Sequence, residues 1–235
     1  MVESIFQSER LYLAFVCASR PSRGKEAAFP AETVEQLNEG FGSVMAARFA
    51  QPVGGELHGL FRAPDAKVAA AVLRVIAEIS GSLTALRPSF GLGLGTLDSE
   101  LKLDAIGLAG PCIDRARKAQ KSARKGALWG GARGFGESRD HALTALLVLL
   151  GGIRSGWTRK QAGYALAARD KMQKDVAADF GVRPSVVCES LRSARFEEVR
   201  AGEQAVERML AQAGSGFSGL FQERWRRGRA TAGAS

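Results

Sequence analysis

Six side chains between residues 183 and 195 could approach the base edges and phosphates of DNA. An arginine on a helix can make two hydrogen bonds to guanine, at O6 and N7. Helical spacing would place these side chains on the outward face of a helix that begins near Pro184. They are Arg183, Ser185, Cys188, Glu189, Arg192 and Arg195. We therefore predict a helix that reads DNA; the alternative is a packed helix pair that binds no nucleic acid.

The residues around this helix favour a helix-turn-helix motif, in which a short helix and a tight turn precede the base-reading helix. Gly181 suits the turn because glycine tolerates a positive φ. Val176 and Ala177 would supply the apolar and small contacts of the first helix. Phe180 would end that helix, and Val182 would anchor the turn. The residues predicted to pack the second helix are Val186, Val187 and Leu191.

Two further basic segments could contact phosphate oxygens. In the predicted helix 114–125, helical spacing places Arg117, Lys121 and Arg124 on one face, available to DNA, to a nucleotide ligand or only to solvent. A basic C-terminal tail offers Arg226, Arg227 and Arg229 as additional phosphate contacts. Of the net charge of +9, residues 114–125 carry +5 and residues 154–235 carry +6, whereas residues 1–113 carry −2. This uneven distribution predicts that one part of the chain meets a polyanion and another part does something else; the alternative is a basic, well-solvated surface.

The composition argues against several other classes of protein. The most apolar window, 142–153, is far shorter than the ~20 residues that cross a bilayer, and no signal peptide is recognisable, so we expect a cytoplasmic protein with no membrane partner. Cys17, Cys112 and Cys188 are scattered and have no histidine at ligand spacing, which predicts neither disulfides nor a metal site. His58 and His141 are isolated from any recognisable catalytic arrangement.

The pattern of apolar residues predicts strands and helices in the first half of the chain and helices alone in the second. Strands are expected over 11–18 and 88–97, with helices over 31–50 and 67–83. The alternation "GLGLG" lacks the Lys and Ser/Thr of a phosphate loop, and it predicts a strand with one small face against which a helix or a neighbouring backbone packs closely. Five glycines in residues 126–137 indicate a loop or hinge. The predicted helices beyond it are 138–151, 158–169, 172–180, 184–195 and 196–212.

Two family resemblances extend this interpretation. The stretch "VAADFGVRPSVVCESLRSA", with "GWTRKQAGYALAA" before it, resembles sigma-factor region 4 and LuxR-type DNA-binding domains. The blocks "AFVCASR", "VGGELHGLF", "SFGLGLGTL" and "AIGLAGPCIDRARKAQK" resemble the SatD family, whose first domain is similar to class III nucleotidyl cyclases and GGDEF domains. Two aspartates of that family align with Phe15 and Gly55 here, which leaves Glu56 as the remaining acid. Because phosphoryl transfer needs carboxylates that hold metal ions, the resemblance implies a domain without catalytic residues.

Together these patterns predict an α+β, ferredoxin-like, cyclase-related domain followed by an all-α helix-turn-helix domain. The predicted domains are 1–137 and 138–213, with a flexible basic tail over 214–235. We expect a DNA-binding transcriptional regulator that is not an enzyme, needs no cofactor and binds double-stranded DNA as a homodimer. The first domain would serve sensing, dimerisation or protein contact. Docking on RNA polymerase or another regulator is one alternative, and nucleotide binding by the first domain is another.

Overall fold

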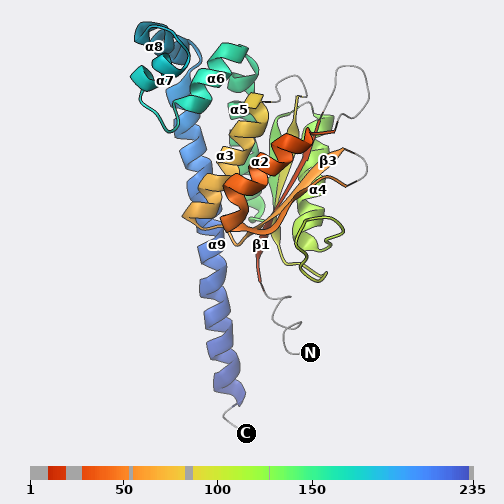
Figure 1. Ribbon diagram of the computed structural model, residues 1–235. Coiled ribbons are helices and arrows are strands. Elements are labelled where there is room, and N and C mark those ends of the chain that lie inside the picture. The colour runs from red at the N-terminus through yellow and green to blue at the C-terminus, as the bar shows by residue number, and fades with distance from the viewer. Residues whose placement is uncertain (1–9, 20–27, 53–54, 83–86, 127, 233–235) are drawn as a thin grey trace.

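The computed structural model describes residues 10–19, 28–52, 55–82, 87–126 and 128–232, with the backbone alone for Ser82 and residues 215–232. Within these residues the chain is mixed α and β, with one five-stranded sheet and helices on both of its faces (Figure 1). No helix in this part of the chain has the length and apolar character needed to cross a membrane.

The sheet is built around a strand that is buried along its whole length, β1 (Tyr12–Ala18). It pairs antiparallel with β3 (Glu56–Arg62) on one side and with β4 (Ser89–Gly95) on the other. β2 (Met45–Ala50) pairs antiparallel with β3, and β5 (Gly130–Arg133) pairs parallel with β4. The resulting strand order is β2-β3-β1-β4-β5. The strands predicted over 11–18 and 88–97 are confirmed.

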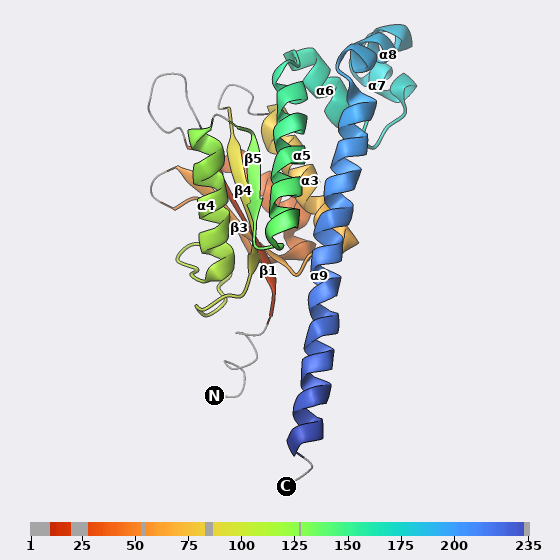
Figure 2. The same ribbon diagram turned by 180° about the vertical axis from the view of Figure 1, so that it is seen from behind.

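Helices cover both faces of the sheet, as Figures 1 and 2 show. α4 (Pro111–Lys125) lies on one face, and α3 (Ala66–Ser82), as predicted over 67–83, lies on the other. The α3 face carries the larger apolar core, which includes the rings of Phe15, Phe61 and Phe90. Three further helices contribute to this core: α2 (Ala31–Phe41), α5 (Glu137–Ser155) and α9 (Phe196–Ala232). A group of short helices lies at one end of the molecule: α6 (Arg159–Ala167), α7 (Gln173–Asp179) and α8 (Pro184–Ser193).

The helix predicted over 31–50 is wrong in its second half. α2 ends at Phe41, a short 3-10 helix follows over Gly42–Val44, and residues 45–50 form the edge strand β2. The side chain of Asn38 fixes this change of direction, because its amide accepts from the backbone N–H of Phe49 and donates to the carbonyl of the same residue. The alternating burial of β2 is typical of a strand with one covered face.

The prediction for "GLGLG" is confirmed, since Gly91, Gly93 and Gly95 of β4 face α4 at very short range. A Cβ at Gly91 would overlap the carbonyl of Ala116, and one at Gly95 would lie 2.9 Å from the backbone nitrogen of Cys112. The three glycines therefore let the backbone of α4 rest directly on the sheet.

The loop or hinge predicted over 126–137 contains the short strand β5. Gly130 pairs with Phe90 of β4, and a Cβ at Gly130 would overlap the ring of Phe90. α5 then returns along the sheet, and its Leu143, Leu147 and Leu150 lie in the same core as β1 and β4. The sheet and the helices packed on it, α5 among them, form the body of the protein.

The last helix also differs from the prediction, which ended it at residue 212 and placed a flexible tail after it. α9 continues to Ala232. The predicted tail begins at Gly214. A Cβ at Gly214 would overlap the carbonyl of Pro64, so α9 packs closely on the body at this residue. Beyond it, the helix projects away from the sheet, toward the end of the molecule opposite α8 (Figures 1 and 2).

Candidate nucleic-acid interface

α6, α7 and α8 share an apolar core that is distinct from the core of the sheet. α7 and α8 are joined by a tight turn in which Gly181 has a φ of 64°, as the sequence predicts for this position. Val176 and Ala177 of α7 are buried against Val187 and Leu191 of α8. The other buried members of this core are Tyr164, Ala165 and Phe196. The two short helices are therefore held in a fixed arrangement by side chains of the motif itself.

Local sequence fixes where α6 and α8 begin. The hydroxyl of Thr158 accepts from the backbone N–H of Gln161, and the side chain of Gln161 accepts from the N–H of Thr158 at 2.8 Å. Pro184 occupies the first turn of α8, where its missing N–H leaves no partner unsatisfied. α8 ends at Ser193 rather than at 195, and Arg195 follows with a φ of 53°.

Most of the predicted base-reading side chains are exposed around α8. Arg183, Ser185, Glu189 and Arg192 are exposed, whereas Cys188 is only half-exposed. Arg195 lies in the link to α9, where it pairs with Glu198 at 3.1 Å. The structure thus brings the first four together around one helix, with Cys188 at the side of it and Arg195 beyond its end.

Two apolar residues of the motif are more exposed than a core position would be, and one of them, Val186, departs from its prediction. Val186, predicted to pack α8 together with Val187 and Leu191, is 45% exposed, whereas Val187 and Leu191 are buried as predicted. Phe180 caps the end of α7 as expected but remains 46% exposed, with its ring edge-on to Tyr164 at 4.9 Å between centroids. Both side chains therefore add apolar surface to the α7–α8 pair.

The predicted phosphate contacts of α4 are not close to α8. Arg117, Lys121 and Arg124 lie on α4, whose face of the sheet is opposite that covered by α5 and α9 (Figures 1 and 2). The side chains of Arg226, Arg227 and Arg229 lie outside the described residues. Their backbone belongs to the part of α9 that projects away from α8. Neither basic segment extends the surface of α8.

Arg117 and Lys121 instead lie near a polar cluster at the start of β3, which contains Glu56. His58 Nε2 lies 2.9 Å from Glu56 Oε2, and His58 is buried. This hydrogen bond lowers the pKa of Glu56 below its ordinary value, burial opposes that shift, and the charges of Arg117 and Lys121 add to it. Close by, the buried Gln120 donates to Ser89 at 3.2 Å. The described residues contain no cluster of three or more His, Cys, Asp or Glu that could hold a metal ion.

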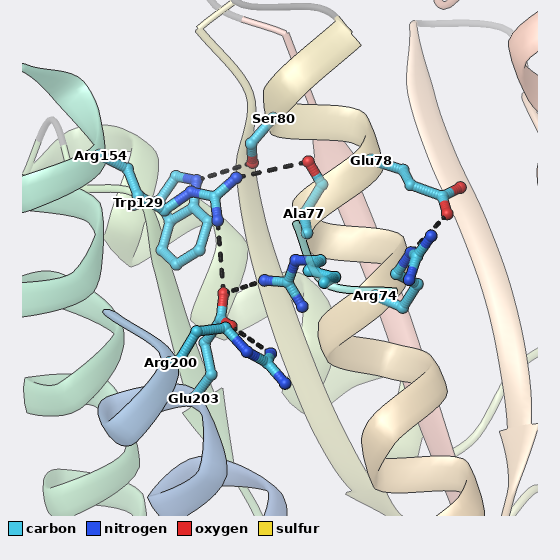
Figure 3. Close-up of polar contacts among 9 residues, drawn as sticks. Arg74, Ala77, Glu78, Ser80, Trp129, Arg154, Arg200 and Glu203 are labelled. Atoms are coloured by element: carbon cyan, nitrogen blue, oxygen red, sulfur yellow. Dashed lines mark hydrogen bonds and ion pairs between the residues drawn. The ribbon is translucent and has the colours of Figure 1, made fainter. Parts of the chain in front are cut away.

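A buried carboxylate on α9 connects the short helices to the body, as Figure 3 shows. Glu203 is 1% exposed and pairs with Arg154 of α5 at 3.3 Å, with Arg200 at 2.8 Å and with Arg169, which follows α6. Burial lowers the pKa of the Arg154 guanidinium to about 10. That guanidinium also lies 5.1 Å from the ring centroid of Trp129 and 4.8 Å from that of Trp157.

A second ion pair joins α3 to the segment between α6 and α7. Arg74 bonds to both carboxylate oxygens of Asp170, at 2.6 and 2.8 Å, and to Glu78 at 2.9 Å. These bonds lower the pKa of Asp170 and raise that of Arg74. In addition, Trp157 donates from its indole N–H to the carbonyl of Ala194 at 2.7 Å, just beyond α8. The group of helices α6–α8 is therefore attached to the sheet and its helices by several polar contacts.

Reasoning from the sequence did not identify Glu203, although the sequence contained a signal for it. Val199, Val206 and Leu210 form an apolar stripe on α9, and Glu203 falls on that stripe at i+4 from Val199. A charged residue within an apolar stripe indicates a buried ion pair. The signal does not name the partners, which come from α5, from the end of α6 and from α9 itself.

No protein-family model, curated protein or solved structure matches this chain.

Proposed function

We propose that this protein is a DNA-binding transcriptional regulator that reads double-stranded DNA through α8. The observation that carries the proposal is the α7–α8 pair. Its buried side chains and its glycine turn hold a short helix with a polar, partly basic outer face. A major groove admits an α-helix, and Ser, Glu and Arg side chains can bond to base edges there. The protein would act in the cytoplasm as a homodimer, because two α8 helices related by a two-fold axis could read paired half-sites.

In this proposal the body of the protein serves sensing, dimerisation or protein contact rather than catalysis. The antiparallel order β2-β3-β1-β4, with helices α2 and α3 as its crossovers, supports a ferredoxin-like, cyclase-related arrangement such as the SatD resemblance implies. The positions of Phe15 and Glu56 support the absence of catalysis. Phe15 packs against Phe49 and Phe90 in the core on the α3 side, whereas Glu56 faces α4. Two carboxylates at these positions would therefore lie on opposite faces of the sheet.

Arg192→Ala should relax sequence selection at one base pair of each half-site. Arg192 is exposed on α8, and a guanidinium that bonds to guanine O6 and N7 is worth about 1–3 kcal/mol against the wrong base. Selection of bound sites from random DNA, with the full chain, measures the change. Arg139→Ala is the matched control, because Arg139 is exposed and lies at the start of α5, outside the α6–α8 group. An Arg192→Ala protein that is folded and selects the unchanged site would contradict this role.

Docking on RNA polymerase is a second candidate function, favoured by apolar surface on α7 and α8. Met172 at the start of α7 is 61% exposed, and Phe180 and Val186 are nearly half exposed. Exposed apolar side chains that gather on one small unit are typical of surfaces that a protein partner covers. Such a partner could bind α7 and α8 in place of DNA or beside it.

Met172→Ser separates the two functions. If the protein docks on RNA polymerase through this surface, the substitution should weaken binding to purified polymerase by about 5-fold or more, since an anchoring side chain contributes over about 1 kcal/mol. DNA selection should then be unaffected. The control is Leu149→Ser, which removes an equally exposed apolar side chain from α5. Equal polymerase binding by both variants and the parent chain would eliminate this candidate.

A further inference from the structure

The outward direction of α8 can be derived from its buried residues. Val187, Leu191 and Ala194 are buried, and successive residues of a helix are rotated by about 100°. The direction opposite the mean of these three falls closest to Glu189. Ser185 lies one turn before it on the same face, and Arg192 lies nearly one turn after it. Glu189, rather than Arg192, therefore occupies the centre of the exposed face.

The carboxylate of Glu189 makes no hydrogen bond or ion pair within the described part of the chain. Its neighbours on α8 do not neutralise it: no bond joins it to Arg192, although the i, i+3 spacing would allow one. A carboxylate accepts hydrogen bonds but donates none, so it cannot bond to phosphate oxygens. Close to DNA it is unfavourable unless it meets a donor. The donors on base edges in the major groove are the N4 amino group of cytosine and the N6 amino group of adenine.

Cytosine fits this carboxylate better than adenine does. Adenine presents the acceptor N7 beside its amino group, and this lone pair would face the second carboxylate oxygen. Guanine presents only acceptors, O6 and N7, and would repel the carboxylate. We propose that Glu189 selects a cytosine at the base position that faces the centre of α8, by accepting a hydrogen bond from its N4 amino group. This inference rests on the proposed DNA-binding function, and it adds an element of selection by repulsion against guanine.

Glu189→Gln tests the inference in the full-length protein, by selection of sites from random DNA. A glutamine amide both donates and accepts, and it pairs in two-point fashion with adenine N6 and N7. The parent chain should select cytosine at one position of each half-site. In Glu189→Gln the preference there should change to adenine, with the ratio of cytosine to adenine falling about tenfold or more, while the other positions stay the same. Glu197→Gln on α9, which removes the same charge from another exposed site, should leave every position unchanged.

A modified base provides an independent measurement. In the selected site, replacing that cytosine by 2-pyrimidinone removes only the N4 amino group. Binding by the parent chain should then weaken about 5-fold or more, whereas binding by Glu189→Ala should change little. If the parent chain selects no sequence at all, the proposed function fails and the inference fails with it. If the parent chain selects a site and Glu189→Gln leaves that site unchanged, only the role of Glu189 is overturned. The same holds if the substitution strengthens binding to every sequence by the same factor.

Discussion

Glu203→Gln should lower the free energy of unfolding by about 3–5 kcal/mol, the usual cost of breaking a buried ion pair by removing one partner. Glutamine preserves the volume of the side chain, so packing on α9 is not the cause. The cost arises because Arg154 and Arg169 have side chains only 9% and 7% exposed, and both lose their anionic partner. Arg154 already has an Nε atom that is buried without a hydrogen-bond partner. Urea unfolding followed by circular dichroism measures the change.

Glu197→Gln is the control for this substitution, because Glu197 lies on the same helix and is exposed. It should change stability by less than about 0.5 kcal/mol. The loss in Glu203→Gln should also be partly recovered by adding Arg154→Met, since that change removes one of the uncompensated buried charges. Recovery would be incomplete, because the methionine cannot reproduce the contacts of the guanidinium with Trp129 and Trp157. Equal stability of the Glu203→Gln and Glu197→Gln proteins would contradict the role assigned to this cluster.

The strand formed by Gly130–Arg133 could not be derived from the sequence. The glycines of residues 126–137 are typical of a loop, and Gly134 and Gly136 do have positive φ values. Gly130–Arg133 forms a strand by pairing with β4, which lies some forty residues earlier in the chain. At Gly130 only a glycine fits, because the ring of Phe90 occupies the place of a Cβ. Local composition contains neither fact. Likewise, the apolar residues of α5 fit a separate helical domain and the core of the sheet equally well.

The α7–α8 pair was more predictable, because its determinants are adjacent in the chain. Gly181, Pro184 and the spacing of Val176, Val187 and Leu191 define the turn and the packed faces without reference to other elements. The error at Val186 has a similar local origin. The sequence does not indicate which of two consecutive valines faces α7. In the structure Val187 is buried there, and Val186 is exposed.

The glycines of β4 were also predictable, since strict alternation with leucine implies one face without side chains. The sequence did not identify α4 as the helix that occupies this face, because many helices could fit a glycine surface. In the structure Cys112 and Ala116 present backbone atoms to Gly93, and Arg115 donates from Nη1 to the carbonyl of Leu94 at 2.7 Å. These contacts make Gly93 the most informative position at which to test the packing of helix on sheet.

Gly93→Ala should destabilise the protein by about 3 kcal/mol, at the upper end of what overpacking usually costs. The new Cβ would overlap the carbonyl oxygen of Cys112 and the backbone nitrogen of Ala116, and it would lie 3.0 Å from Ala116 Cα. These are backbone atoms of a helix, so no side chain can rotate to make room, and α4 must move away from β4. Gly40→Ala is the matched control, because nothing lies within 4 Å of a Cβ at Gly40, which is in α2. There, alanine should stabilise the helix by about 0.5–1 kcal/mol. Urea unfolding of both variants should therefore give shifts of opposite sign, and a Gly93→Ala protein as stable as the parent chain would show that α4 does not rest on the glycine face of β4.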